Sequence, residues 1–214
     1  MSVLKEGYPF IFPSYTAGLT LAAAAVFITL PPVVRIIFII TGVLLIIFAF
    51  FCVFFFRDPK IVVTQSEGAV LSPCNGTVME VTEEGNEKVI RVFLSIFSVH
   101  LQRSPVSGTV VSVTHKNGKF LAAWDKRAHV ENEQNVFVIK SADSIFTVRQ
   151  IAGLVARRCV SWAGNGDVLE AGDKIGMIKF SSQVDLHMPG KTEITVKPGD
   201  KTKAGITIVA RLSG

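Results

Sequence analysis

Three short segments of this 214-residue chain hold side chains that could transfer protons, attack a carbonyl or bind an anion. They are residues 72–76 (Ser-Pro-Cys-Asn-Gly), residues 97–108, which include His100 and Arg103, and residues 179–189, which include the adjacent pair Ser181 and Ser182. Histidine titrates near neutral pH, and a serine hydroxyl becomes a nucleophile when a neighbouring base takes its proton. These are therefore the residue types to weigh for acid–base and nucleophilic chemistry.

Each segment also has a plainer interpretation. Pro-Cys-Asn-Gly is a turn sequence, a histidine at a strand end is more often packed or solvated than catalytic, and two serines can simply form a surface loop. Spacing along the chain does not choose between these interpretations. The elements that would position the three segments have to be considered next.

Charge divides the chain into two parts. Residues 10–56 hold one charged side chain, Arg35, and nearly all Lys, Arg, Asp and Glu follow Phe56. The net charge of +5 contains no long basic run, which argues against nucleic-acid binding. A basic excess after an apolar segment favours contact with anionic lipid head groups, although a merely solvated surface explains it equally well.

The apolar part predicts a membrane hairpin. Residues 33–56 are long enough to span a bilayer, residues 14–30 are marginal, and Pro31-Pro32 separates them. A cleaved signal peptide is disfavoured, because the apolar stretch starts late and a longer one follows. Basic residues outside both ends place the ends in the cytoplasm. Residues 1–57 are thus predicted to be a two-span anchor in the cell (inner) membrane, with residues 58–214 as a cytoplasmic catalytic domain.

The polar part predicts a β-rich α+β domain. Short alternating runs with β-branched residues indicate strands, at residues 89–97, 108–114, 135–140, 145–148, 175–180, 193–196 and 206–212. Helical spacing predicts one helix at residues 150–161. Three cysteines without close spacing argue against structural zinc and a disulfide framework, and they fit a reduced compartment.

Two weak internal repeats refine this fold class. Residues 73–78 echo residues 105–110, and residues 166–172 echo residues 199–205. Each places a glycine-containing turn before a strand, where positive φ costs glycine little. Paired turns of this kind are typical of sandwiched β-barrels, so the sequence predicts a sandwiched-barrel-like domain. This analogy concerns the fold and says little about chemistry.

Taken together and in order, the segments resemble the short-type phosphatidylserine decarboxylase family over the whole chain. The resemblance rests on Phe-Phe-Arg-Asp-Pro at 55–59, Ser-Pro-x-x-Gly at 72–76, Val-His-x-x-Arg-x-Pro-Val-x-Gly at 99–108, Glu-Asn-Glu at 131–133, Arg-Gln-Ile-Ala-Gly at 149–153 with Ala-Arg-Arg at 156–158, and Ser-x-Val-Asp at 182–185.

The resemblance implies a proenzyme that cuts itself between Ser181 and Ser182. Residues 58–181 would then be a β-chain part and residues 182–214 an α-chain that begins with a pyruvoyl group made from Ser182. That group would take up electrons while phosphatidylserine loses its carboxylate to become phosphatidylethanolamine. His100 is the candidate for the proton transfers, and no metal is implied. Candidates for the lipid phosphate are Arg103, Arg157 and Arg158, and the family suggests a homodimer.

Two positions depart from the family pattern. Asn75 stands where the family has an aspartate that assists the histidine in self-cleavage, and Ser181 stands where the family has glycine. An asparagine can orient a histidine but gives no charge to stabilise an imidazolium. Ser181 restricts the backbone, although a Ser-Ser junction can be cut chemically. The expected result is a proenzyme that processes slowly.

Three alternatives remain beside the enzyme. An inactive lipid-binding relative would be distinguished by the absence of a fragment starting at residue 182. A membrane-anchored lipoyl or biotinyl carrier would need a modifiable lysine at a hairpin tip, and neither repeat has one in the usual context. A zinc hydrolase would need closely spaced histidines, which this chain lacks. The sequence does not distinguish phosphatidylserine from archaetidylserine, which share a head group.

Overall fold

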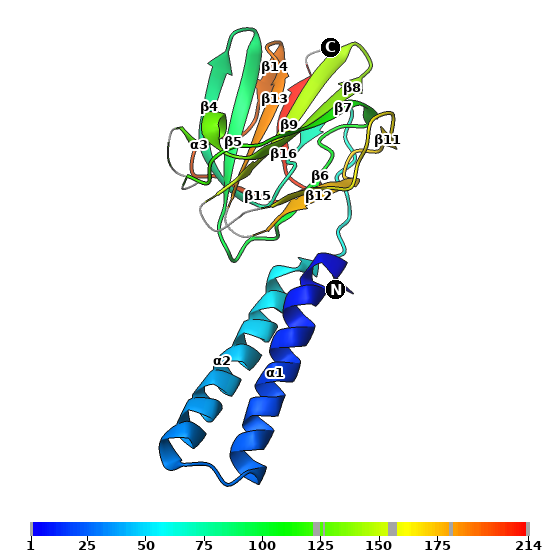
Figure 1. The fold of residues 1–214 in the computed structure, drawn as a ribbon. Helices are drawn as coiled ribbons and strands as arrows, with labels where there is room; N and C mark the ends of the chain where they lie inside the picture. The colour runs from blue at the N-terminus through cyan, green and yellow to red at the C-terminus, as the bar shows by residue number, and fades with distance from the viewer. Residues whose placement is uncertain (1, 122–124, 126, 154–157, 180–181, 213–214) are drawn as a thin grey trace. The chain divides into compact units, whose positions relative to one another are not determined.

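The structure is a computed structural model that describes residues 2–121, 125, 127–153, 158–179 and 182–212. The chain forms two compact units, Met1–Lys60 and Ile61–Gly214, which Figure 1 shows as a helical hairpin and a β-rich domain.

The first unit contains two apolar helices, α1 (Tyr8–Phe27) and α2 (Pro32–Phe55), each long and apolar enough to cross a membrane. A short 3₁₀ turn, η1 (Lys5–Gly7), precedes α1, and β1 (Ser2–Val3) pairs with β2 (Arg57–Asp58). Helix α1 begins six residues before the predicted start at residue 14, because Pro13 lies inside the helix rather than before it. Near a helix start a proline removes only one main-chain hydrogen bond.

Two glycines allow the helices to approach closely. A Cβ built on Gly18 would lie 2.9 Å from the carbonyl oxygen of Gly42, and a Cβ on Gly42 would lie 2.9 Å from that of Gly18. Small residues at such crossings are common where membrane helices pack by van der Waals contact. The apolar sequence therefore forms a hairpin whose two helices are in direct contact.

The second unit is built on one curled antiparallel sheet. Among the described residues its strand order is β11-β7-β8-β9-β13-β5-β4-β15. The bounds are β4 Gly76–Glu84, β5 Glu87–Leu94, β7 Gly108–Lys116, β8 Gln134–Ser141, β9 Ser144–Ala152, β11 Val168–Leu169, β13 Ser182–Pro189 and β15 Lys201–Thr202.

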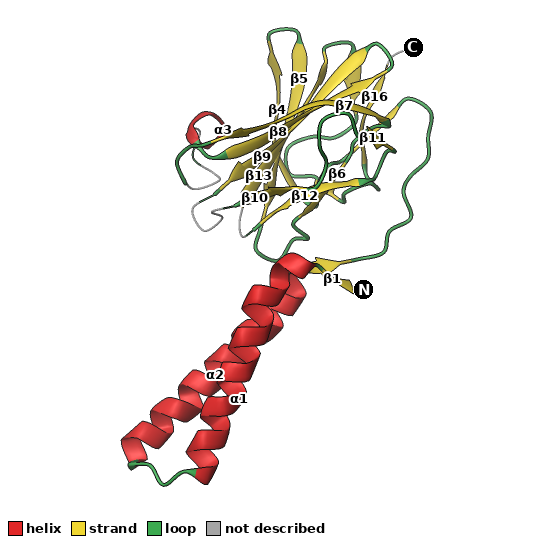
Figure 2. Cartoon of the chain, turned by 45° about the vertical axis from the view of Figure 1, so that its right-hand side comes forward, coloured by secondary structure: helices red, strands yellow, loops and turns green. Residues whose placement is uncertain are grey.

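Two three-stranded sheets and one helical turn complete this unit. One sheet has the order β10-β12-β6 and the other β14-β16-β3. Their bounds are β3 Ala69–Leu71, β6 Leu101–Arg103, β10 Cys159–Ser161, β12 Lys174–Ile178, β14 Thr192–Ile194 and β16 Ile208–Leu212, and α3 is Ala128–Glu131. Figure 2 shows β6, β10 and β12 side by side at one end of the domain.

The hydrophobic core lies on the concave face of the large sheet. Alternate residues of its central strands point there, among them Ile90, Val92, Phe137, Phe146, Val148, Val184 and Leu186, all at most 1% exposed. Burial of one such side chain stabilises the fold by roughly 1.5–3 kcal/mol. The predicted β-rich, sandwiched-barrel-like fold class is confirmed as a half-barrel sheet after two apolar helices.

The first sequence repeat corresponds to two equivalent strand starts. Gly76 opens β4 and Gly108 opens β7. A Cβ on Gly76 would lie 2.3 Å from the carbonyl oxygen of Phe93, and a Cβ on Gly108 would lie 2.3 Å from that of Lys140. Each glycine therefore lets a neighbouring strand pass where no side chain fits.

The second repeat corresponds to two equivalent turns with glycines at positive φ, +90° at Gly172 and +69° at Gly205. The Gly172 N–H donates to the carbonyl of Ser104 (2.8 Å), and the Gly205 N–H donates to that of Ser72 (2.9 Å). The strand order is symmetric about the β9–β13 pair in the same way. The repeats therefore mark an approximate two-fold symmetry of the domain.

One predicted element is wrong, and several strands were missed, β13 among them. The expected helix at residues 150–161 is replaced by the end of β9 and by β10, with residues 154–157 outside the described part. Its apparent helical spacing arises because Gln150 faces the core as a buried polar residue, which breaks the strand alternation. Strand β13 was not predicted either, although Gln183 to Met188 alternate polar and apolar residues, and its polar side is buried as well as its apolar side.

Candidate active site

Ser182 is the first residue of the central strand β13. It pairs with Leu94, the last residue of β5, and with Ala152, the last residue of β9. Side chains alternate along a strand, so Ser182 faces the same side as Val184 and Leu186, toward the core. The serine is therefore held between two neighbouring strands, at one end of the large sheet.

The Ser182 hydroxyl is buried and makes no hydrogen bond to the residues that the structure describes. Its Oγ is inaccessible to solvent and has no partner among the described residues. A buried polar atom normally has a partner, because leaving it unsatisfied costs about 1–3 kcal/mol. An orphaned hydroxyl at this position is a feature that folding alone does not explain.

His100 lies at the same end of the domain. Its carbonyl accepts from the N–H of Ile178 (3.1 Å), four residues before Ser182. The ring is buried, with Nδ1 3.0 Å from the carbonyl oxygen of Ser98. A carbonyl only accepts, so Nδ1 carries the proton and Nε2 holds the lone pair in the neutral ring. The contact with Ser98 thus fixes the tautomer that can act as a base through Nε2.

A chain of buried amides supports His100, and none of the sequence motifs indicated it. Gln102 donates through Nε2 to the His100 carbonyl (3.0 Å) and accepts at Oε1 from Gln150 (2.8 Å). Gln150 accepts in turn from Asn135 (3.1 Å), whose Oδ1 is 2.8 Å from His115 Nδ1. Polar residues at core-facing strand positions were the signal that could have revealed it.

Asn132 explains the Glu-Asn-Glu segment. Its side-chain nitrogen donates to the carbonyls of Ala152 (2.7 Å) and Leu121 (2.9 Å), and its oxygen accepts from the N–H of Leu121 (2.8 Å). Ala152 is the β9 residue that pairs with Ser182. This asparagine therefore ties a covering loop to the strand beside the serine.

Asn75 lies at the same sheet end but bonds elsewhere. It precedes Gly76 at the start of β4, which pairs with β5, and β5 pairs with β13. Two strand spacings separate Asn75 from Ser182, roughly 10 Å between backbones. The Asn75 oxygen accepts from the N–H of Ala204 (3.1 Å). The structure thus places Asn75 at this end of the sheet with its oxygen bonded to the backbone. The His100 ring bonds through Nδ1 to the carbonyl of Ser98.

The arginine candidates differ in their surroundings. Arg103 is buried, and its Nη1 donates to the carbonyl of Gly172 (2.7 Å), which gives it a structural contact. Arg158 is exposed, and its carbonyl accepts from the N–H of Lys179 (3.2 Å). Arg157 lies outside the described residues, as does Ser181.

A row of charges crosses the convex face of the sheet three residues after Ser182. Asp185 pairs in register with Arg91 on β5 and with Arg149 on β9. Burial raises the Asp185 pKa to about 6, while a hydrogen bond from Gln183 and the charges of the two arginines lower it. Arg91 also forms ion pairs with Glu80 and Glu84.

His187 continues this convex-face row toward the other end of the sheet. Its Nδ1 is 3.0 Å from Glu87 Oε2. Burial lowers the His187 pKa, and so does the charge of Arg149, whereas Glu87 raises it. By strand alternation His187 faces away from the core, so it does not share the side of the sheet that Ser182 and its neighbours occupy.

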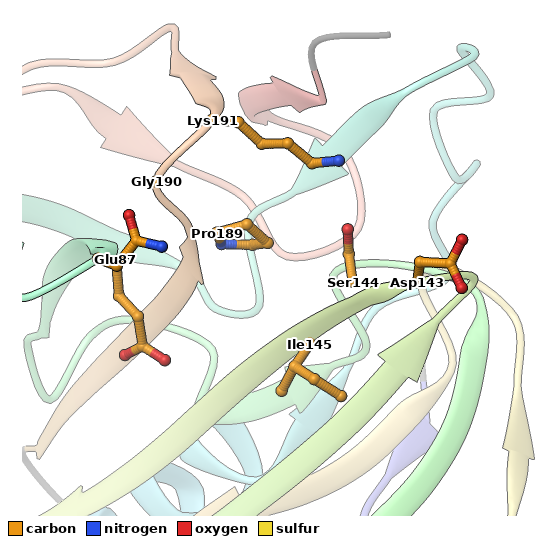
Figure 3. A pocket seen from close by; sticks show the side chains of 8 residues that line it. Glu87, Asp143, Ser144, Ile145, Pro189, Gly190 and Lys191 are labelled. Carbon is orange, nitrogen blue, oxygen red and sulfur yellow. The ribbon is translucent and has the colours of Figure 1, made fainter.

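A hollow of about 530 Å³ lies at the opposite end of the sheet from Ser182. Figure 3 shows the side chains around it, with Glu87, Asp143 and Lys191 as its charged members. Its walls come from hairpin ends and contain none of the candidate residues. Among the described residues, no group of three or more His, Cys, Asp or Glu side chains is placed to hold a metal ion. The candidate residues that the structure describes therefore lie away from this hollow.

Comparison with known proteins agrees with these motifs. A family model described as Phosphatidylserine decarboxylase matches residues 48–210. A protein of Geobacter sulfurreducens named "Phosphatidylserine decarboxylase proenzyme" is 40% identical over 98% of this chain and 96% of its own length. Proteins of the same name from Magnetococcus marinus and Solibacter usitatus are 36% and 41% identical, over 99% and 78% of this chain and 96% and 81% of their own lengths.

Proposed function

Because this chain belongs to the phosphatidylserine decarboxylase family, we propose that it converts phosphatidylserine to phosphatidylethanolamine after cutting itself before Ser182. The single observation that carries the proposal is the buried Ser182 hydroxyl at the start of the central strand, which has no hydrogen-bond partner among the described residues. The motif resemblance assigns the family's cleavage serine to this position. Near-complete coverage of relatives named as proenzymes supports the same reaction.

Self-cleavage uses the chain's own atoms. The Ser182 Oγ attacks the carbonyl carbon of Ser181, the peptide C–N bond breaks, and an ester joins the two residues. Loss of the Ser182 Cα proton then expels the Ser181 carboxylate, and hydrolysis releases ammonia to leave a pyruvoyl group. Pairing with β5 and β9 holds the Ser182 backbone in place, and such an attack needs a nucleophile that is held in place.

His100 is the proposed base in both stages. Its fixed tautomer leaves Nε2 to accept the Ser182 hydroxyl proton, and its backbone is tied to β12 four residues before that serine. Proton transfer by a positioned histidine contributes typically about 10²–10⁴-fold to a rate. The amide chain through Gln102 and Gln150 keeps this histidine from shifting. Asn75 is proposed as the residue that limits self-cleavage, because it brings no charge.

When formed, the pyruvoyl group supplies an electron sink for the decarboxylation. The orphaned hydroxyl fits this role, since the atom that must be converted is not needed as a hydrogen-bond donor in the fold. The exposed Arg158 is the better candidate for the lipid phosphate, because the Arg103 guanidinium contacts a backbone carbonyl. Arg157 stays a candidate on sequence grounds alone.

The two apolar helices associate the chain with a membrane. The proposed site is the inner membrane with the β-rich unit in the cytoplasm. Lys5, Arg57 and Lys60 at the outer ends of the helices support this orientation under the positive-inside rule. The proposed homodimer rests on the resemblance.

Ser182→Ala tests the function. The variant should run as one uncut chain and form no phosphatidylethanolamine, whereas wild type should yield a fragment of residues 182–214 with a mass that matches a pyruvoyl terminus. The matched control is Ser144→Ala, because Ser144 begins β9 as Ser182 begins β13. It should cut and react like wild type.

The same measurements separate the rival function. A Ser182→Ala protein that is cut and active would overturn the pyruvoyl assignment. A wild-type chain that stays whole under all conditions, and yet binds phosphatidylserine vesicles, would identify an inactive lipid-binding relative.

A further inference from the structure

The loop before His100 presents large apolar side chains to solvent. Phe97 is 66% exposed and Ile96 is 39% exposed. The loop is ordered as a tight turn, since the N–H of Ser98 donates to the carbonyl of Ser95 (2.8 Å) and their hydroxyls are 3.2 Å apart. Two adjacent exposed apolar residues at a turn tip gain nothing from water. Together they form a small apolar patch on the surface of the domain.

Strand register places this tip at the Ser182 end of the domain. His100 bonds Ile178 at the end of β12, and Ile178 pairs with Cys159 at the start of β10. Residues 95–99 therefore extend past the end of this small sheet, at the same end from which the chain runs on to Ser182. The exposed residues Ile96 and Phe97 and the proposed nucleophile Ser182 therefore lie at the same end of the domain.

Two cations stand in the next row of the same sheet. Lys179 follows Ile178, and Arg158 precedes Cys159, with the N–H of Lys179 donating to the carbonyl of Arg158 (3.2 Å). Arg158 is exposed and Lys179 is partly exposed. Apolar side chains beside Lys and Arg are the composition of surfaces that enter the head-group region of a bilayer, where cations meet anionic lipid.

We propose that residues 95–99, with Arg158 and Lys179, form a docking surface that inserts Ile96 and Phe97 into the lipid bilayer. The occupant is the membrane that carries the chain's own two apolar helices, because the β-rich unit is covalently tethered to them. As far as it concerns the substrate, the inference rests on the proposed function. It adds that the head group enters the Ser182 site directly from the bilayer, without lipid leaving the membrane.

Depth-dependent quenching tests the proposal on the full chain in lipid nanodiscs. Phe97→Cys is labelled with an environment-sensitive fluorophore, and spin-labelled phosphatidylcholine is the quencher. Background labelling is low, because Cys74 is fully buried and burial raises the pKa of Cys159 to about 12. The chain without the added cysteine, treated with the same fluorophore, measures the remaining background labelling.

The matched control is Ile145→Cys. Ile145 is 43% exposed and lies at the far end of β9, seven residues from Ala152, roughly 23 Å along the strand. We expect several-fold stronger quenching at position 97 than at 145. Replacing Arg158 and Lys179 by glutamine should reduce the difference only in discs that contain anionic phosphatidylglycerol.

Equal quenching at the two positions would overturn the docking surface. So would strong quenching at position 97 that the two glutamines leave unchanged in anionic discs, since a purely apolar contact would then suffice without the cations. The assay contains no phosphatidylserine and needs no turnover. Its failure therefore leaves the decarboxylase assignment intact, and loss of decarboxylation in separate assays leaves the docking result intact.

Discussion

Asn75 offers the oxygen of an aspartate without its charge. Its oxygen accepts from the Ala204 N–H, which an aspartate could also do. We expect Asn75→Asp to speed self-cleavage by about tenfold or more, because a nearby carboxylate stabilises a histidine that has taken up a proton. A time course of intact mass measures this rate.

The control for charge alone is Asn165→Asp. The Asn165 oxygen likewise accepts from a backbone N–H, that of Val113 (2.7 Å). Its substitution should leave the cleavage rate unchanged. Complete cleavage of the wild type during expression would show that Asn75 does not limit the reaction.

Asp185 gives the protein a measurable pH dependence. Its pKa is raised to about 6 by burial, so the folded chain holds this proton more tightly than the unfolded chain does. Ionisation of Asp185 therefore lowers the free energy of unfolding as the pH rises from about 4 to about 6. The total loss is roughly 3 kcal/mol. The stability of wild type relative to Asp185→Asn should fall across this window and level off above it.

Thermal unfolding of the detergent-solubilised chain at a series of pH values measures this difference. Both proteins contain His187, whose titration largely cancels in the comparison. A relative stability that increases with pH would mean that Arg91 and Arg149 stabilise the carboxylate by more than burial costs it.

Single residues were predictable from sequence only where a motif carried them. Ser182, His100 and Asn75 follow from the segments that hold them, and the structure gathers those segments at one end of the domain. Gln102 and Gln150 looked like ordinary strand or helix residues, because their role depends on partners 48 positions apart. Contacts at such separation leave no local signal.

At the scale of elements, glycines that open strands constrain the sheet. Gly76→Ala places a Cβ 2.3 Å from the Phe93 carbonyl, which forces β4 away from β5. We expect this substitution to lower the free energy of unfolding by about 2 kcal/mol or more, and to lower the yield of cut protein. The control Gly164→Ala meets nothing closer than 3.8 Å and should be neutral. The unfolding temperatures of the two variants test this prediction. Equal temperatures would show that the close approach of β5 to Gly76 does not limit stability.

Several strands were predicted from their alternating sequences, whereas β13 was overlooked. Strands β7, β8 and β9 alternate in burial as their sequences do, so their predicted ranges overlap the observed ones. Strand β13 buries both faces, one in the core and one beneath charged side chains. Its sequence nevertheless alternates polar and apolar residues from Gln183 to Met188, so a strand was visible there. Its place at the centre of the sheet follows only from its pairing with β5 and β9.

For the whole molecule, the start of the β-rich unit can be tested by truncation. Ile61 packs over Gly205, Val63 packs over Gly172, and Thr64 donates to the carbonyls of Gly205 (3.1 Å) and Ile206 (2.6 Å). We expect residues 61–214 to fold without the helices. Residues 66–214 should unfold about 5 °C lower or more, because these contacts are lost.

Circular dichroism during heating compares the two fragments. If the two fragments unfold at the same temperature, residues 61–65 contribute nothing to stability. If neither folds, the β-rich unit depends on the helices, and its predicted independence is wrong. At this scale the sequence was most informative, because the separation of apolar and charged residues is visible without any knowledge of contacts.

The central position of β13 has a consequence for the life of the cut protein. Its eight residues are paired with β5 along their whole length and with β9 over six of them. Once the backbone is cut before Ser182, residues 182–214 can dissociate only if β13 breaks its hydrogen bonds to both β5 and β9. Dissociation would then be as slow as global unfolding. Cut molecules should therefore not exchange their carboxy-terminal fragments. Each amino-terminal fragment would stay bound for its lifetime to the carboxy-terminal fragment of the same precursor chain.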